Sequence, residues 1–163
     1  MIYRLIEPTE YEVLDDFLYE AIFVPDGMEP PPRDVIFAPS LNHYVKGFGR
    51  AGDTCFVCED NGQIVGAVWS RILDEPGNKG YGNVGDGIPE LSISVLPKYR
   101  SQKIGTELLA RLHHALGAQG YDRISLSVQK ANPALRLYER CGYQTVREQD
   151  EDYIMVKHLD LCC

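Results

Sequence analysis

The spacing of hydrophobic residues changes several times along the chain and predicts alternating strands and helices. Residues 2–6 form a short apolar run typical of a strand, and residues 10–20 repeat apolar side chains at helical spacing. Residues 105–119 place apolar side chains about four positions apart, which predicts an amphipathic helix that Gly120 ends. Both kinds of element are therefore expected in one chain.

The clearest pairing signal is a hairpin in the first half of the chain. Residues 54–59 and 63–73 are strand-like, and Asp60-Asn61-Gly62 between them tolerates the positive φ of a tight turn. Asn132-Pro133 further on supplies a favoured start for a second helix, which Gly142 ends. Four more runs predict strands: residues 90–95, 124–128, 143–146 and 153–156.

Two segments have the composition of loops. Residues 25–40 contain five prolines and predict an ordered loop that flanks a short helix over 41–48. Residues 74–87 contain five glycines, including a literal G-x-G-x-x-G at 80–85. Asp86-Gly87-Ile88-Pro89 follows and cannot open the helix that a dinucleotide site requires. The segment is expected to be either a mobile loop beside a substrate pocket or a simple exposed loop.

Composition narrows the class of protein. With 163 residues, 44% hydrophobic and 25% charged, the chain is expected to fold as a single domain over 1–163. A net charge of −8 argues against a nucleic-acid partner. The acidity either favours a cationic substrate or serves solubility alone. There is no membrane-length apolar run and no apolar stretch of the signal-peptide type at the N-terminus, so we expect a cytoplasmic protein without a membrane partner.

The cysteines do not form a metal-binding pattern. Their number, five, is odd, and free thiols are the expected state in a reducing compartment. Cys55 and Cys58 are three apart in a predicted strand and so point to opposite faces, which excludes a shared zinc ion. His158 with Cys162 and Cys163 is a weak terminal constellation. We therefore predict that the protein holds no metal.

The most informative segment runs from Glu90 to Thr106 and predicts a strand, a short loop and the start of a helix. A helix N-terminus there directs unpaired backbone N–H groups and the positive end of its dipole into the loop, which favours a phosphate. Arg100, Gln102 and Lys103 add side-chain donors, and Gly105 permits close approach of a ligand. Any strand followed by a helix offers such an end, so this segment alone leaves a purely structural role open.

The segment resembles the pyrophosphate-binding pattern R-x-x-G-x-[GA] of the GNAT superfamily of acetyl-CoA-dependent N-acetyltransferases. Arg100 and Gly105 match, but Lys103 stands where the pattern has its first glycine, and Ser101 follows the arginine. If Lys103 must take positive φ, the strain would be about 1 kcal/mol, and its ammonium could offset that near a pyrophosphate. Downstream, Asn132, Leu137, Tyr138, Gly142 and Tyr143 match a second GNAT pattern, N-x-x-A-x-x-L-Y-x-x-x-G-F/Y, with Leu135 in the alanine position.

The resemblance implies an α/β fold of the GNAT type. Its central sheet is mixed and mostly antiparallel, is flanked by helices, and has two central strands, 90–95 and 124–128, that splay apart to admit acetyl-CoA. It also implies an acceptor-side part over about 1–89 and a cofactor-binding part over about 90–145. The implied cofactor-binding residues are Ile93, Ser94, Val95, Arg100, Ser101, Gln102, Lys103, Ile104, Gly105, Thr106 and Asn132.

Two residues are expected to carry the chemistry. An aliphatic amine is mostly protonated at neutral pH, so a base is useful, and Glu90 at the start of its strand is the candidate. Tyr138, matched to the family pattern, is the candidate acid for the leaving thiolate. The alternatives left open are an ordinary solvated carboxylate for Glu90 and a tyrosine packed on the core for Tyr138.

The expected reaction is acetyl transfer from acetyl-CoA to a primary amine of an unidentified small molecule. A protein or peptide amine, and a catalytically silent CoA-binding sensor, are the alternatives. Homodimers are common in the family, so a second copy of the chain is a further candidate partner. The residues expected to line the acceptor pocket are Tyr19, Phe23, Asp26, Glu29, Tyr44, Trp69 and Tyr81.

Overall fold

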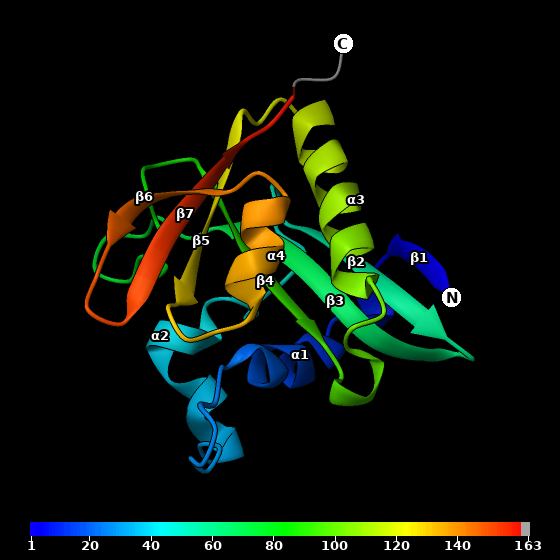
Figure 1. Ribbon diagram of the computed structural model, residues 1–163. Helices are drawn as coiled ribbons and strands as arrows, with labels where there is room; N and C mark the ends of the chain where they lie inside the picture. The colour runs from blue at the N-terminus through cyan, green and yellow to red at the C-terminus, as the bar shows by residue number, and fades with distance from the viewer. Residues whose placement is uncertain (161–163) are drawn as a thin grey trace.

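The computed structural model describes residues 1–160 and shows a seven-stranded sheet with helices on both faces (Figure 1). The sheet order is β1-β2-β3-β4-β5-β7-β6, and every neighbouring pair is antiparallel except β4 and β5. The strands are β1 (Ile2–Leu5), β2 (Thr54–Asp60), β3 (Gln63–Ile72), β4 (Pro89–Val95), β5 (Arg123–Gln129), β6 (Gln144–Glu148) and β7 (Asp152–His158). The predicted mixed, mostly antiparallel sheet is thus confirmed.

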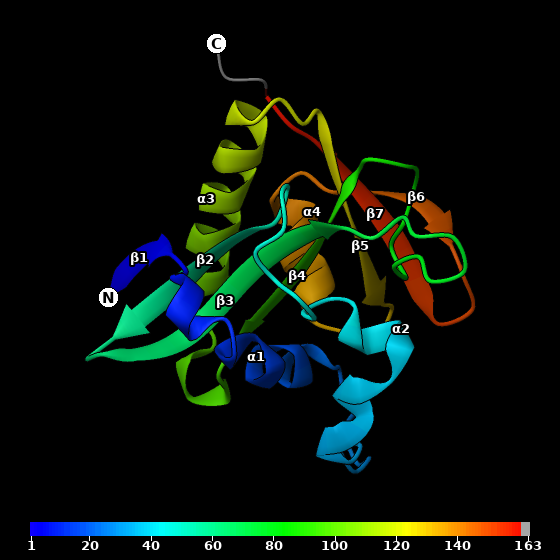
Figure 2. The same cartoon turned by 180° about the vertical axis from the view of Figure 1, so that it is seen from behind.

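Different helices cover the two faces of the sheet. The α-helices are α1 (Val13–Ala21), α2 (Pro39–Asn42), α3 (Ile104–Ala118) and α4 (Ala134–Arg140), and the 3₁₀ turns are η1 (Pro8–Glu10), η2 (Arg33–Phe37) and η3 (Pro97–Tyr99). Helices α3 and α4 pack on one face, and α1 with the η2–α2 segment lies on the other (Figures 1 and 2). Each face has its own buried apolar cluster, so the sheet separates two cores.

The structure confirms the predicted hairpin of β2 and β3 and the tight turn between them. Asn61 has φ 50° and Gly62 has φ 81°, which is the positive-φ pair that a two-residue hairpin turn requires. Cys55 belongs to the apolar cluster under α1, whereas Cys58 belongs to the cluster under α3, because a strand alternates its side chains between faces. Both are free thiols, as is Cys141. Cys162 and Cys163 lie outside the described residues.

The prediction of a short helix over 41–48 was wrong in its position. Helix α2 spans only Pro39–Asn42, and the chain then continues in turns. Pro39 lies in the first turn of this helix, where its fixed φ suits helical geometry and its missing N–H would have no partner. The helix therefore starts at the proline rather than after it.

Strands β4 and β5 pair at one position only, Glu90 with Ser125. By contrast, the β3–β4 and β5–β7 pairs each extend over seven positions. The backbone of β4 beyond Glu90 is therefore paired with β3 on one side, while β5 contributes no registered partner on the other.

Candidate active site

A cavity of about 1350 Å³ lies at this interruption of the sheet. The predicted cofactor-binding residues other than Gln102 line it, and so do Glu90 and Tyr138. Residues of α1 also line it, and so do Phe23, Asp26 and Val35 from the segment that follows α1 and enters η2. One cavity thus brings the β4–α3 loop together with both predicted catalytic side chains.

The β4–α3 loop has the left-handed backbone that the family pattern would give to glycine. Ser101 has φ 63° and Lys103 has φ 65°, and Lys103 immediately precedes the first helical residue, Ile104. An L-residue in this conformation costs about 1 kcal/mol. This backbone turns the N–H groups at the start of α3 toward the loop, where an anion would be held.

Arg100 is fixed by two contacts at the mouth of the loop. Its Nε donates to the carbonyl oxygen of Val95 at 2.9 Å, and its Nη2 lies 3.6 Å from Glu20 Oε2 on α1. The guanidinium side chain is 53% exposed, so a ligand can compete with this ion pair. Arg100 therefore lies between the loop and helix α1.

Two other predicted cofactor residues have different surroundings. Gln102 is exposed and is the one predicted cofactor residue that the structure does not place in the lining of the cavity. It lies between Ser101 and Lys103, which both have positive φ. Asn132 lines the cavity, and its Oδ1 accepts a hydrogen bond from the N–H of Ala134 at 2.9 Å. This bond caps the start of α4, in agreement with the predicted cap.

Glu90 is not a solvated carboxylate, and that alternative reading was wrong. The residue is 3% exposed, and burial raises the pKa of its carboxyl group from 4.5 to about 7. Its Oε2 accepts hydrogen bonds from the Tyr44 hydroxyl at 2.5 Å and from the N–H of Gly82 at 3.1 Å, and both bonds work against that rise in pKa. Its Oε1 is buried and has no hydrogen-bond partner within the described chain. A carboxyl group with this pKa exchanges protons near neutral pH.

The glycine-rich loop packs against Glu90, so the reading of a simple exposed loop was also wrong for its centre. Gly80 and Gly82 are buried. A Cβ at Gly80 would overlap Oε1 of Glu90, and one at Gly82 would lie 2.6 Å from the backbone carbon of Leu126. Glycine is required at Gly82 because the β5 backbone approaches there, and a side chain at Gly80 would displace the carboxyl group of Glu90.

Tyr138 lines the cavity from α4 and is 8% exposed. Burial raises the pKa of its phenol above the ordinary value of 10, which keeps the hydroxyl protonated at neutral pH. Its ring packs edge-on to Tyr143 with a centroid distance of 5.8 Å. The side chain therefore packs on the core and also lines the cavity. The first agrees with a structural tyrosine, and the second is what a catalytic acid requires.

Five of the seven residues predicted to line the acceptor pocket line the cavity. Tyr19, Phe23, Asp26, Tyr44 and Tyr81 line the cavity, but Glu29 and Trp69 do not. Trp69 is 1% exposed and lies in the core beneath α1, because the strand alternation of β3 directs it to that face.

Sequence reasoning missed a buried ion pair next to the site. Arg71 on β3 and Asp53, just before β2, have side chains that are 1% and 4% exposed. Neither residue belongs to a recognisable motif. The only signal in the sequence was a charged residue within a largely apolar strand.

No group of metal-ligating side chains occurs among residues 1–160. Within that same range, no helix is long and apolar enough to cross a membrane.

The fold and the site together are those of an acyl-transferring enzyme, and comparison with known proteins gives the family. Residues 12–143 match the Acetyltransferase (GNAT) family, and the chain belongs to it. A curated relative is the [ribosomal protein bS18]-alanine N-acetyltransferase of Haemophilus influenzae, 31% identical over 88 residues. That match covers 53% of this chain and 52% of the relative, so it spans about half the length of each.

Solved structures agree on the fold. The PaiA N-acetyltransferase of Thermoplasma acidophilum, solved in complex with coenzyme A, superposes with a TM-score of 0.69 at 18% identity, covering 97% of this chain and 99% of that one. The ribosomal-protein-S18-alanine N-acetyltransferase of Escherichia coli superposes with a TM-score of 0.66 at 18% identity, covering 99% and 96%. At this identity the two structures establish the GNAT fold of the chain.

Proposed function

We propose that the protein transfers the acetyl group of acetyl-CoA to the N-terminal amine of a protein or peptide. The observation that carries this proposal is a single cavity that holds both an anion-binding helix start and a buried carboxyl group with a pKa of about 7. The first feature suits the pyrophosphate of a CoA thioester, and the second suits removal of a proton from an ammonium group.

The residues present fit acetyl-CoA. The N–H groups at the start of α3, with Arg100 and Lys103, would hold the pyrophosphate. Backbone groups of Ile93 to Val95, which have no registered partner on β5, would hold the pantetheine arm. The single registered pair between β4 and β5, Glu90 with Ser125, agrees with the splay that the family resemblance implies. When bound, acetyl-CoA supplies a thioester carbonyl that an amine can attack.

The chain's own groups then manage the protons. Ionised Glu90 accepts a proton from the ammonium group of the acceptor, directly or through a water, and leaves a neutral amine. The amine nitrogen forms a bond to the carbonyl carbon, and backbone N–H groups of β4 meet the negative charge that develops on oxygen. As the carbon–sulfur bond breaks, the Tyr138 hydroxyl donates its proton to the departing sulfur, and the nitrogen of the new amide loses its surplus proton to solvent, from which Tyr138 is reprotonated.

The match of pKa values favours an N-terminal amine as acceptor. An α-amino group has a pKa of about 7.7–8.0, within roughly one unit of Glu90, whereas a lysine-type amine has a pKa of about 10.4. Proton transfer to Glu90 is therefore easier from an α-amine than from a lysine-type amine, by more than two pKa units. The name of the relative from Haemophilus influenzae, an alanine N-acetyltransferase that acts on a ribosomal protein, supports the same class.

A small-molecule amine is the second candidate. Asp26 and Glu90 both line the cavity, and two carboxyl groups in its lining suit a small cation. An alkyl amine has a pKa of about 10.4, roughly three units above that of Glu90, so Glu90 is a weak base for it. The small-molecule amine is therefore the less favoured of the two acceptors.

The test combines binding with turnover. Acetyl-CoA is titrated calorimetrically into the protein, and thiol release is then followed with peptides that begin with alanine, with the same peptides blocked at the N-terminus, and with polyamines. Release with the free peptides alone supports the proposal, and release with polyamines alone supports the second candidate. Acetyl-CoA binding without release from any of them would favour a silent sensor.

The catalytic assignments have their own variants. Tyr138→Phe is expected to lower kcat about tenfold or more while the affinity for acetyl-CoA is nearly unchanged, because only the departing thiolate loses its donor. Glu90→Gln is expected to reduce kcat/KM most between about pH 7 and the pKa of the acceptor, where Glu90 is ionised and the acceptor is still protonated. Unchanged rates in either variant would remove the role assigned to that residue.

A further inference from the structure

The two oxygens of the Glu90 carboxyl group have different surroundings. Oε2 accepts two hydrogen bonds, one from the Tyr44 hydroxyl and one from the N–H of Gly82. Oε1 is buried without a partner in the described chain. The hydroxyl oxygen of Tyr44 in turn accepts the N–H of Tyr81 at 2.9 Å. With that acceptor position filled, the hydroxyl hydrogen is directed at Oε2.

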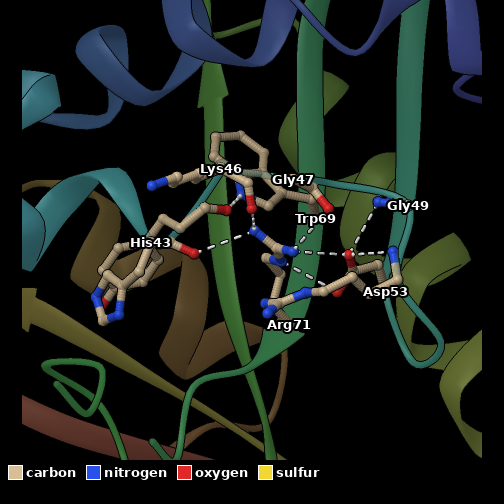
Figure 3. A network of polar contacts seen from close by, with 9 residues as sticks. His43, Lys46, Gly47, Gly49, Asp53, Trp69 and Arg71 are labelled. Carbon is tan, nitrogen blue, oxygen red and sulfur yellow. Dashed lines mark hydrogen bonds and ion pairs between the residues drawn. The ribbon is translucent and has the colours of Figure 1, made fainter.

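Arg71 lies opposite Glu90 on the neighbouring strand, but its guanidinium group forms its ion pair with another residue. Arg71 on β3 pairs with Glu90 in the β3–β4 register, a spacing at which opposite charges normally interact. Its guanidinium group instead bonds Asp53, with Nε 3.0 Å from Oδ1 and Nη2 3.0 Å from Oδ2 (Figure 3). Glu90 is thereby left with an uncharged partner, the Tyr44 hydroxyl.

The same guanidinium group fixes the backbone that carries Tyr44. Arg71 donates to the carbonyl oxygens of His43 at 3.1 Å, Lys46 at 2.6 Å and Gly47 at 3.3 Å (Figure 3). Trp69, two residues away on the same face of β3, donates its indole N–H to the carbonyl oxygen of Tyr44 at 3.0 Å. Hydrogen bonds therefore hold the backbone at Tyr44 and on both sides of it, and this fixes the position of the Tyr44 hydroxyl group.

The other groups that face Glu90 carry no charge. At the paired position on β5 stands Ser125, whose Oγ is also buried without a partner in the described chain. The glycine-rich loop contributes the N–H of Gly82 and the backbone of Gly80. A carboxylate so enclosed depends on its hydrogen bonds for the stability of its ionised form.

We propose that Tyr44 is a positioning residue for Glu90: its hydroxyl donates to Oε2 and so orients the carboxyl group that accepts the proton of the acceptor. The proposal rests on the proposed function, in which Glu90 is the base. Tyr44 acts through Glu90, by stabilising the carboxylate and orienting it. Loss of the hydroxyl therefore makes the ionised form of Glu90 rarer at neutral pH without removing the carboxyl group.

The direct test measures the titration of Glu90 in the whole protein. Protein labelled with ¹³C at the glutamate carboxyl carbons is titrated by NMR, and the Glu90 signal is assigned by its loss in Glu90→Gln. In Tyr44→Phe we expect the midpoint to move upward by about one pH unit, because a hydrogen bond to the charged form is lost. Tyr121→Phe, a tyrosine outside the cavity, should leave the midpoint unchanged. An unchanged midpoint in Tyr44→Phe would overturn the proposal.

The kinetic test uses the alanine-starting peptide as acceptor. A midpoint raised from about 7 to about 8 lowers the ionised fraction at pH 7 about fivefold and leaves it nearly unchanged at pH 9. Tyr44→Phe should therefore lose about fivefold in kcat/KM at pH 7 and recover close to the wild-type rate at pH 9. A purely structural role would give a loss that persists at pH 9, and that result would overturn the proposal.

The two proposals fail in different ways. If Glu90→Gln keeps the wild-type rate and pH profile, Glu90 is not the base and the proposed mechanism fails, whatever Tyr44 does. If Glu90→Gln is inactive but Tyr44→Phe has the wild-type profile and titration, only the positioning role of Tyr44 fails.

Discussion

The two ends of the cavity are built in different ways. The end expected to hold the pyrophosphate is made by one continuous segment, the loop from Arg100 to Thr106, which the next helix continues. The end that holds Glu90 depends on segments far apart in the sequence, around Tyr44, Asp53, Arg71 and Gly82. A local arrangement tolerates an unusual residue such as Lys103, whereas a long-range arrangement requires several segments to be correct together.

An arginine paired with a carboxylate belongs to each region, Arg100 in the lining of the cavity and Arg71 outside it, which allows a direct comparison. Arg100 and Glu20 are 53% and 29% exposed, and their closest atoms lie 3.6 Å apart. Arg71 and Asp53 are 1% and 4% exposed and make bonds of 3.0 Å. Water screens the first pair and not the second, so the same chemistry should have very different consequences for stability.

The largest effect is expected from removing the buried partner. Asp53→Ala leaves the guanidinium group of Arg71 buried without a counter-charge and should lower the free energy of unfolding by about 3–5 kcal/mol. The matched change at the other end, Glu20→Ala, should cost less than about 1 kcal/mol. Urea denaturation of both variants measures the difference. Similar costs for the two variants would contradict the division drawn between the ends of the cavity.

A somewhat smaller effect should come from pH. The pKa of Glu90 is raised in the folded chain from 4.5 to about 7, so the folded state binds more protons than the unfolded state between these values. Its contribution to stability is complete below about pH 4.5 and is lost as the pH rises through about 7, by as much as about 3 kcal/mol.

Comparison of wild type with Glu90→Gln isolates this contribution. The free energy of unfolding of the variant, relative to wild type, should rise between pH 5 and pH 8, as measured by urea denaturation at both values. If the difference between the two proteins does not change over this range, Glu90 does not have a raised pKa.

The smallest effect is expected in the cofactor loop. Lys103 has φ 65° in the structure, and we expect it to keep this conformation when acetyl-CoA binds, so its strain should not lower the affinity. Lys103→Gly and Lys103→Asn, both of which accept this conformation, should weaken acetyl-CoA binding by at most about fivefold through loss of the charge.

Calorimetry at two salt concentrations separates charge from strain. The difference between wild type and the Lys103 variants should shrink at high salt, because salt screens an exposed charge. A tenfold tighter binding by Lys103→Gly would show instead that the bound loop is strained by lysine.

Much of the fold could be predicted from the sequence because its signals are local. The hairpin turn at Asn61-Gly62, the start of α3 after Lys103 and the end of α4 at Gly142 each depend on a few adjacent residues. The short helix was placed wrongly because a single proline, Pro39, sets its start. Element boundaries are where local preference is weakest.

The sequence by itself determined the family pattern and the lining of the cavity by Arg100, Gly105 and Tyr138, because these positions follow from spacing within one strand–loop–helix unit and the helix after it. Only the tertiary structure decided that Glu90 is buried and bonded to Tyr44, and that Arg71 is bonded to Asp53 rather than to its cross-strand neighbour. The environment of a charged group is set by whichever segments fold over it, and those contacts join residues that no local pattern connects.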